Sequence, residues 1–329
     1  MNFHRLMDEI GVRNMWRYPR PPVDSTVEEL TDLANAPDEK LNVAVGPAEL
    51  EPVAGGGELE EHFAFPSQCA SGAPELDTAY CVRWRRYGAR CGGRVALLLA
   101  HGAYAASHAK PLLFVPDART AEWDTWLLEL PEHMRRQRPG SRYSGEFMVT
   151  GDAGRITRTI LQAQADLRAL SARLAEMGYE RVVLVGISIG ASPVMQSLVR
   201  CGPEVAGAVG IVPSVDAYSG LWDSLLGRGL RPTGNAAGIT DDMAGRVLSR
   251  ITPRLVGRPK LDPSRVLLAY CRHDLVARPH ESLDLARDWG GCALAPLDAG
   301  HATVIALYPR IRRMVGKWMR HIVPECARR

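Results

Sequence analysis

Runs of consecutive apolar residues alternate with amphipathic segments over the last two thirds of the chain. Largely apolar runs occur at residues 94–100, 125–130, 181–187, 205–212 and 265–271. Strands of this kind are buried on both faces, as in a parallel sheet covered by helices. Residues 154–177 instead carry apolar side chains every three or four positions, which predicts a long helix that Gly178 ends. The pattern predicts an α/β fold with a mostly parallel, doubly wound sheet and helices on both faces.

Weaker patterns flank these runs. Residues 61–66 and 79–87 are apolar only in part, and we expect them to form an antiparallel edge of the sheet. Residues 104–115 favour a helix interrupted by Pro111. Near the C-terminus the pattern predicts a helix at 279–289, a short strand at 292–296, and a closing helix at 303–321 that is kinked or restarted at Pro309.

The first 60 residues show the weakest pattern. A helix is expected near residues 3–16 and a shorter one at 26–34, capped by Ser25 or Thr26. We therefore divide the chain into an N-terminal helical or irregular extension, residues 1–60, and a main domain, residues 61–329. We expect the extension to pack on or beside the main domain, with a place over the functional site as one option.

One long segment interrupts the alternation of strands and helices. About fifty residues separate the runs at 205–212 and 265–271, which is too many for a simple crossover between strands. The segment contains Trp222, Leu225 and Leu226 and then an amphipathic stretch. It predicts a helical lid insertion at about residues 214–263.

Composition narrows the function classes. The chain has 329 residues, 46% of them hydrophobic, and a formal net charge of +3, so we expect neither a nucleic acid nor a membrane as partner. The sequence shows no signal-peptide core and no apolar stretch long enough to span a bilayer, which predicts a cytoplasmic protein. No phosphate loop, dinucleotide fingerprint or metal-ligand cluster is evident, so we expect no cofactor and no metal. The oligomeric state is not predicted.

The candidate nucleophile lies directly after the apolar run at 181–187. Residues 186–190 read Gly-Ile-Ser-Ile-Gly, and the segment that follows favours a helix. A serine on a strand-to-helix turn adopts strained backbone angles, and the glycines let neighbouring chain pass close to it. The motif alone is weak in a chain with 31 glycines, and its flanking strand and helix make it stronger. The alternative is a glycine-rich strand end that only turns the chain.

A serine hydroxyl needs a base and a carboxylate that orients the base before it attacks a carbonyl group. His301 follows the last predicted strand, and Asp274 follows the strand before it. Loops after parallel strands gather at the same edge of the sheet, so both residues are predicted to meet Ser188. Asp216 is an alternative acid, and His301 has an alternative role as a loop histidine bonded to the backbone.

The same edge is predicted to hold the donors that stabilise an oxyanion. One is the backbone N–H of Ile189, at the start of the helix after the serine. The other is expected from the turn His101-Gly102-Ala103, where we favour the N–H of Ala103. His101 and Gly102 are also candidates for contact with the substrate, although His101 is equally well explained as a strand-end residue.

Three further residues are candidates for substrate contact. Trp126 lies near the expected cleft, Trp222 lies in the predicted lid, and His133 lies in a long polar loop. Each has an alternative role in the core or in holding a loop. The substrate partner we expect is a small or medium acyl compound with an apolar part.

The chain order Ser188, Asp274, His301, with His-Gly-Ala after an earlier central strand, resembles the serine-dependent α/β-hydrolase superfamily. The resemblance covers about residues 60–322. Residues 130–136 also look like a bacterial branch in which an L-P-x-H-x-x-R loop precedes the nucleophile. One departure from the pattern is Ala191, which replaces the commoner glycine after the second glycine of the motif.

The resemblance implies an α/β-hydrolase fold and a triad of Ser188 as nucleophile, Asp274 as acid and His301 as base, with oxyanion donors from Ile189 and Ala103. The expected reaction is hydrolysis of an ester, thioester or lactone through an acyl-enzyme. The alternative is a lyase on the same fold that eliminates acetate from an acetylated, tetronate-type polyketide intermediate. A binding protein without catalytic activity is the third hypothesis.

Overall fold

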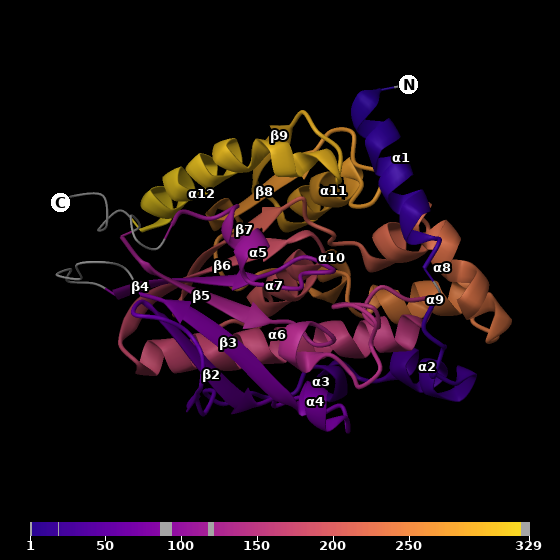
Figure 1. The fold of residues 1–329 in the computed structure, drawn as a ribbon, viewed down its shortest axis with the longest axis horizontal. Helices are drawn as coiled ribbons and strands as arrows, with labels where there is room; N and C mark the ends of the chain where they lie inside the picture. The colour runs from indigo at the N-terminus through magenta and orange to yellow at the C-terminus, as the bar shows by residue number, and fades with distance from the viewer. Residues whose placement is uncertain (1, 19, 86–93, 118–121, 324–329) are drawn as a thin grey trace.

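A computed structural model describes residues 2–18, 20–85, 94–117 and 122–323, and its described residues form one nine-stranded sheet between layers of helices (Figure 1). The strand order is β1-β2-β3-β5-β4-β6-β7-β8-β9. The strands are β1 (Glu51–Val53), β2 (Glu60–Pro66), β3 (Thr78–Trp84), β4 (Arg94–Ala100), β5 (Asp124–Glu129), β6 (Tyr179–Ile187), β7 (Val205–Ile211), β8 (Val266–Cys271) and β9 (Ala293–Leu297). In this spatial order, the pairs β1–β2, β2–β3 and β3–β5 are antiparallel, and every neighbouring pair from β5–β4 to β8–β9 is parallel.

The central strands are buried on both faces, as their continuous apolar runs predict. In β4, Leu98 faces a cluster that includes the helix α6 (Ala153–Glu176), whereas Leu97 and Leu99 face a second cluster on the other side. All three leucines have no exposed surface. The predicted fold class, a mostly parallel sheet with helices on both faces, is confirmed.

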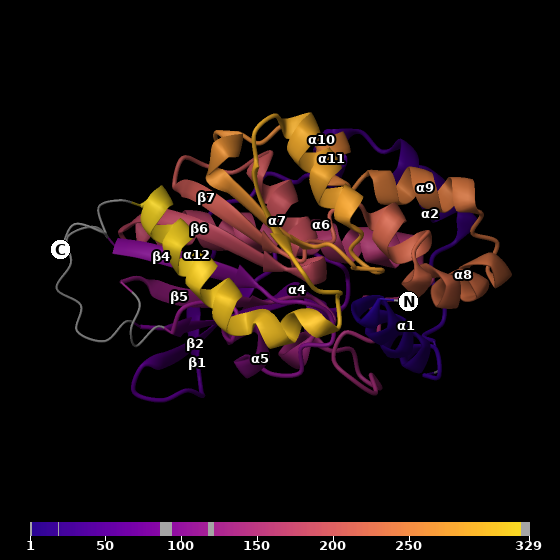
Figure 2. The same ribbon diagram turned by 90° about the horizontal axis from the view of Figure 1, so that it is seen from above.

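The helices divide between the two faces of the sheet (Figure 2). On one face lie α6, α7 (Ala191–Leu198) and α11 (Pro279–Trp289), and on the other lies α12 (Tyr308–Ile322). A 3-10 helix, η5 (Thr303–Leu307), precedes α12, which begins one residue before Pro309. The expected restart at this proline is therefore present, because a proline is tolerated in the first turn of a helix.

Three predictions for the first half of the chain need correction. The sheet already begins with β1, inside the region assigned to the extension; this three-residue strand is mostly exposed and so lacks an apolar pattern. The strand expected at 79–87 ends at Trp84, and its residues 86 and 87 lie outside the described residues. The helix expected at 104–115 is reduced to α5 (Ala109–Leu112).

The N-terminal helices pack on the main domain rather than folding separately. They are α1 (Phe3–Met15), α2 (Val27–Asn35) and α3 (Asp38–Leu41), and a further short helix, α4 (Pro74–Asp77), precedes β3. Thr26, one of the two expected caps, bonds the N–H of Glu29 while the Glu29 carboxylate accepts the N–H of Thr26. Both ribbon views place α1 beside α8 (Leu225–Ala236) and the loops that follow β8 and β9 (Figures 1 and 2).

The segment between β7 and β8 is helical. It contains a π-helix, η3 (Tyr218–Trp222), followed by α8 (Leu225–Ala236), α9 (Asp241–Ser249) and α10 (Pro253–Val256). Helix α9 packs against α2 and α6, and α8 packs against α1. In the described parts of the chain, none of the helices combines the length and the apolar character needed to cross a bilayer.

Candidate active site

Ser188 lies on the sharp turn between β6 and α7, and its φ angle is +52°. The turn is possible because the residues two positions before and after the serine are glycines: a Cβ on Gly190 would lie 2.2 Å from the carbonyl oxygen of His101, and one on Gly186 would lie 2.4 Å from Cα of Ala191. Backbone passes so close to the turn that only glycine fits. The serine is thereby held above the carboxyl end of the sheet.

Three side chains from separate loops form a continuous hydrogen-bonded chain. The Oγ of Ser188 lies 3.0 Å from Nε2 of His301, and Nδ1 of His301 lies 2.8 Å from Oδ2 of Asp274. The other oxygen of Asp274 accepts the backbone N–H groups of Val276 at 2.8 Å and Ala277 at 2.9 Å, which fixes the carboxylate. The structure thus brings together the nucleophile, base and acid that were predicted from the sequence.

The alternative assignments for this site do not match the geometry. Asp216, the competing acid, accepts a bond from Arg254 at 3.2 Å instead of approaching His301. The His301 ring contacts two side chains, so it is not a loop histidine bonded only to the backbone.

Electrostatics favour the protonated form of His301. Burial lowers the pKa of the imidazole, but the adjacent Asp274 carboxylate raises it through charge and hydrogen bonding, with smaller contributions from Asp8 and Glu281, and the net pKa lies above the usual 6.5. An imidazole with a raised pKa is a stronger proton acceptor. His301 is therefore suited to take a proton from Ser188.

The expected oxyanion donors lie next to the serine. Ile189 and Ala103 both line the cavity that contains Ser188. Gly102 packs directly on the nucleophile, since a Cβ at that position would lie 3.4 Å from Cβ of Ser188. The N–H groups of Ile189 and Ala103 therefore lie near the position where an oxyanion would form, and their role as its donors stays a prediction.

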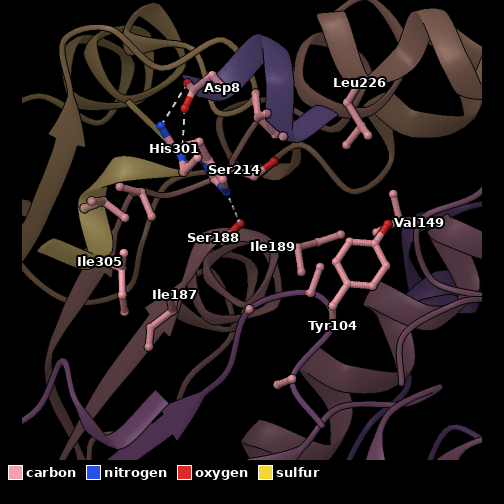
Figure 3. A pocket seen from close by; sticks show the side chains of 18 of the residues that line it. Asp8, Tyr104, Val149, Ile187, Ser188, Ile189, Ser214, Leu226, His301 and Ile305 are labelled. Atoms are coloured by element: carbon pink, nitrogen blue, oxygen red, sulfur yellow. Dashed lines mark hydrogen bonds between the residues drawn. The ribbon is translucent and has the colours of Figure 1, made fainter. Parts of the chain in front are cut away.

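A mostly apolar cavity of about 350 Å³ opens beside the Ser188 hydroxyl (Figure 3). Its walls come from α1, from the turn after β4, from the loop after β7, from the insertion and from η5. The apolar lining includes Val12, Met15, Tyr104, Phe114, Val149, Ile187, Val212, Leu221, Leu226, Val276, Val304 and Ile305. A cavity of this size and character suits a small or medium apolar group.

Backbone strain is concentrated around this cavity. In the described residues, five non-glycine residues have a positive φ, and three of them, Ser188, Tyr104 and Val212, line the cavity. Such conformations cost free energy and tend to occur at functional sites. For Val212 the φ of +43° is especially unfavourable because its side chain is β-branched.

The N-terminal helix supplies a residue that the sequence analysis missed. Asp8 of α1 accepts backbone N–H bonds from Leu275, His301 and Ala302, which belong to the two loops that carry the acid and the base. It is 2% exposed. The only signal in the sequence is an acidic residue on the same helix face as Val12, and that signal does not show which loop it contacts.

Two histidines that were candidates for substrate contact are structural. His101 is fully buried, donates from Nδ1 to the Gly102 carbonyl, and accepts at Nε2 the N–H of Leu130. Burial lowers its pKa to about 4, and burial together with the charge of His101 lowers that of His133 to about 3. Neither ring lines the cavity, so the expectation of substrate contact is corrected: both rings hold the loops after β4 and β5.

Two tryptophans are also placed away from the cavity. Trp126 is fully buried on the sheet, where it stacks on Phe63 and bonds Tyr179. Trp222 is fully buried in the insertion and donates to Asp241 at 2.8 Å. Their large apolar surfaces fill the core, which corrects their assignment to substrate binding. Of the five candidates for substrate contact, Gly102 alone lines the cavity.

The loop that resembles the L-P-x-H-x-x-R pattern anchors the chain to α6. Arg136 is fully buried, pairs with Asp166 of α6 at 2.8 Å, and donates to the carbonyl groups of Glu129 and Leu76. Its neighbours Glu132 and Met134 have positive φ angles. Among the described residues, no group of three His, Cys, Asp or Glu side chains is arranged to hold a metal ion.

No protein-family model matches the sequence, and no curated protein matches it. Solved structures do resemble it. Acetyl xylan esterase 1 from Thermoanaerobacterium sp. JW/SL YS485 has a TM-score of 0.55 at 14% identity, over 93% of this chain and 98% of that one. Est1E from Butyrivibrio proteoclasticus, with ferulic acid bound, has a TM-score of 0.53 at 11% identity, over 75% and 96%.

A longer protein shares the same fold over part of its length. Prolyl oligopeptidase B from Galerina marginata has a TM-score of 0.58 at 13% identity, over 81% of this chain and 36% of that one. Identities this low establish the fold alone. The chain has the α/β-hydrolase fold, as the resemblance in its sequence implies.

Proposed function

We propose that the protein is a serine hydrolase that cleaves a carboxylic ester, or the chemically related thioester or lactone, through an acyl-enzyme. The observation that carries the proposal is the chain of hydrogen bonds from Ser188 through His301 to Asp274 at the edge of an apolar cavity. The presence of esterases among the similar structures supports it.

The geometry supports a two-stage reaction. His301 accepts the Ser188 proton at Nε2 while Oγ attacks the acyl carbon, and Asp274 stabilises the resulting imidazolium. The imidazolium then protonates the leaving alcohol or thiol, which leaves Ser188 acylated. In the second stage His301 activates water, which attacks the acyl-enzyme and releases the carboxylic acid.

Charge on the tetrahedral intermediates needs donors that are fixed in advance. The N–H groups of Ile189 and Ala103 are proposed for this role, since both residues lie at the cavity beside Ser188. The first also lies at the start of α7, where the helix dipole favours negative charge.

The cavity supports a substrate with a small or medium apolar portion. Its volume of about 350 Å³ is at the lower end of the range for ligand sites, and its lining is mostly aliphatic and aromatic. We therefore propose apolar acyl groups of modest length rather than large or highly charged donors.

The proposal is tested by measuring turnover of esters from acetyl to octanoyl with the wild-type protein and Ser188→Ala, in water enriched in oxygen-18. We expect turnover by the wild type only, with one oxygen-18 atom in the released carboxylate. The competing reaction is elimination of acetate from an acetylated, tetronate-type intermediate, which breaks the bond between alkyl carbon and oxygen and releases unlabelled acetate. No turnover of any acyl compound would contradict both reactions.

A further inference from the structure

Asp8 is a buried carboxylate that joins the N-terminal helix to both loops of the candidate triad. Its Oδ2 accepts the N–H of Leu275 at 3.1 Å and the N–H of His301 at 2.9 Å. Its Oδ1 accepts the N–H of Ala302 at 2.8 Å. Figure 3 shows the last two bonds as dashed lines, with Asp8 on α1 above the His301 ring. The side chain thus connects the residue after Asp274 with the backbone of the base itself.

A second observation shows that the loop is shaped to receive this carboxylate. A Cβ on Gly300 would lie 2.7 Å from Oδ1 and 2.8 Å from Oδ2 of Asp8. Real Cβ atoms do not approach other atoms this closely, so the residue before His301 must be glycine for Asp8 to reach the two N–H groups. Gly300 does not have a positive φ, so the contact with Asp8 rather than the backbone conformation requires glycine here.

Other contacts fix α1 against the same loops. Nδ1 of His4 lies 2.9 Å from Oγ1 of Thr303, and the His4 ring stacks on His273, which precedes Asp274. Val12 and Met15, one and two turns beyond Asp8, line the cavity. One face of the helix therefore both closes the cavity and holds the loops beside it.

We propose that Asp8 is a positioning residue for the serine hydrolase activity. Its carboxylate fixes the loops that carry Asp274 and His301 relative to each other, so that the imidazole stays within hydrogen-bond distance of Ser188. This proposal rests on the proposed function. A carboxylate that accepts three backbone N–H groups makes strong, directional bonds. An error of about 1 Å in the place of a catalytic group costs about 100-fold in rate.

The Asp8 charge also acts on the base. The titratable groups that raise the pKa of the His301 imidazole, against burial, which lowers it, are Asp274, Asp8 and Glu281. Burial raises the pKa of Glu281 itself to about 8, so at neutral pH Asp274 and Asp8 carry the charge that acts on the base. Replacing Asp8 by a neutral residue removes one of these two negative charges. The pKa of His301 then falls, and the pH below which activity is lost falls with it, because the imidazole must be neutral to accept a proton.

The experiment compares Asp8→Asn with Glu9→Gln in the full chain. Glu9 is the next residue of α1 and pairs with Arg13 at the surface, so its variant removes the same charge without touching the loops. For Asp8→Asn we expect kcat to fall about 10- to 100-fold with KM changed less than about threefold, and the acid limb of the kcat/KM profile to move to lower pH. Glu9→Gln should match the wild type in kcat, in KM and in the pH of the acid limb.

A double-mutant cycle separates positioning from loss of folding. Gly300→Ala should lower kcat as Asp8→Ala does, because its methyl group displaces the carboxylate. If both substitutions act through the same contact, adding Gly300→Ala to Asp8→Ala lowers kcat little further. If they act independently, the two reductions in kcat multiply. Thermal unfolding of each variant shows that the comparison is made on folded protein.

The rate at which a fluorophosphonate labels Ser188 gives a readout without a substrate. Labelling that slows in Asp8→Asn and not in Glu9→Gln supports the proposal. If the wild type is labelled, and Asp8→Asn and Asp8→Ala show the same labelling rate and the same kcat as the wild type, the positioning role of Asp8 is overturned. The proposed function would remain intact. A wild type that neither reacts with the probe nor turns over esters would overturn the proposed function and this inference with it.

Discussion

The turn that carries Ser188 and the helix α1 contribute to the same cavity in different ways. The turn is held by backbone packed against backbone, with a glycine on each side where a Cβ would overlap neighbouring atoms. Helix α1 is held by side chains, chiefly Asp8 and His4, that contact loops almost 300 residues away in the sequence. The first arrangement is complete once the end of β4 packs beside β6 and α7, whereas the second is complete only when α1 meets the loops after β8 and β9.

This difference predicts how each region responds to change. A rigid turn has no way to adapt, so substitutions there should abolish activity or destabilise the fold. A docked helix forms a wall of the cavity and supports the base from outside, so substitutions there should change rate, pH dependence and substrate size by smaller factors. The four predictions below run from the largest expected effect to the smallest.

Ser188→Ala removes the nucleophile and should lower kcat by about 10⁴- to 10⁶-fold with little effect on folding. The matched control is Ser214→Ala, since Ser214 also lines the cavity but is absent from the hydrogen-bonded chain described above. Steady-state kinetics on activated esters measure both. Equal activity of the two variants would refute the assignment of the nucleophile.

Gly190→Ala places a methyl group 2.2 Å from the backbone carbonyl oxygen of His101 and 2.6 Å from that of Ala100, so the backbone must shift to accept it. We expect a loss of about 2–4 kcal/mol in the free energy of unfolding, measured by urea denaturation. Gly57→Ala is the control, because a Cβ there has no neighbour within 4 Å. An unchanged midpoint for Gly190→Ala would show that the turn is not rigid.

Gly11→Leu tests α1 as a wall of the cavity. A Cβ at Gly11 makes only an ordinary contact with Ala302, at 3.9 Å, so the helix should accept the change. The longer side chain extends along the cavity, and kcat/KM for octanoyl esters should fall about 10-fold relative to acetyl esters. Gly11→Ala, which adds one methyl group, should leave this ratio near the wild-type value. Equal ratios in all three proteins would place the acyl chain elsewhere.

Thr26→Ala removes the cap of α2, which lies away from the cavity. Thr26 and Glu29 each bond the other's backbone N–H, and losing the hydroxyl should cost about 1 kcal/mol of unfolding free energy. The kinetic constants should not change, because no cavity residue belongs to this helix. A fall in kcat would show that the whole N-terminal region, and not only α1, supports the site.

The sheet and the meeting of Ser188, His301 and Asp274 could be predicted because they depend on apolar runs, on one short motif and on the order of parallel strands. The apolar run at 94–100 coincides with β4, and the motif around Ser188 encodes its own turn. Chain order and parallel strands then place Asp274 and His301 at the same edge. These predictions require no knowledge of side-chain packing between distant segments.

The residues that line and support the cavity could not be predicted in the same way. Trp126, Trp222 and His133 are residue types common at binding sites, yet they are buried elsewhere because large side chains also fill cores. Asp8 has no local partner, since its three donors lie in the last 60 residues of the chain. Contacts of this kind depend on how two finished surfaces meet, and a one-dimensional pattern does not record them.

Covalent labelling tests the central claim most directly. Wild-type protein treated with a fluorophosphonate and digested should carry one adduct, on the peptide that contains Ser188, and reaction should slow as the pH falls below the raised pKa of His301. Ser188→Ala should carry none. An unlabelled wild type, or an adduct on another residue, would contradict the account of Ser188, His301 and Asp274 as one catalytic unit.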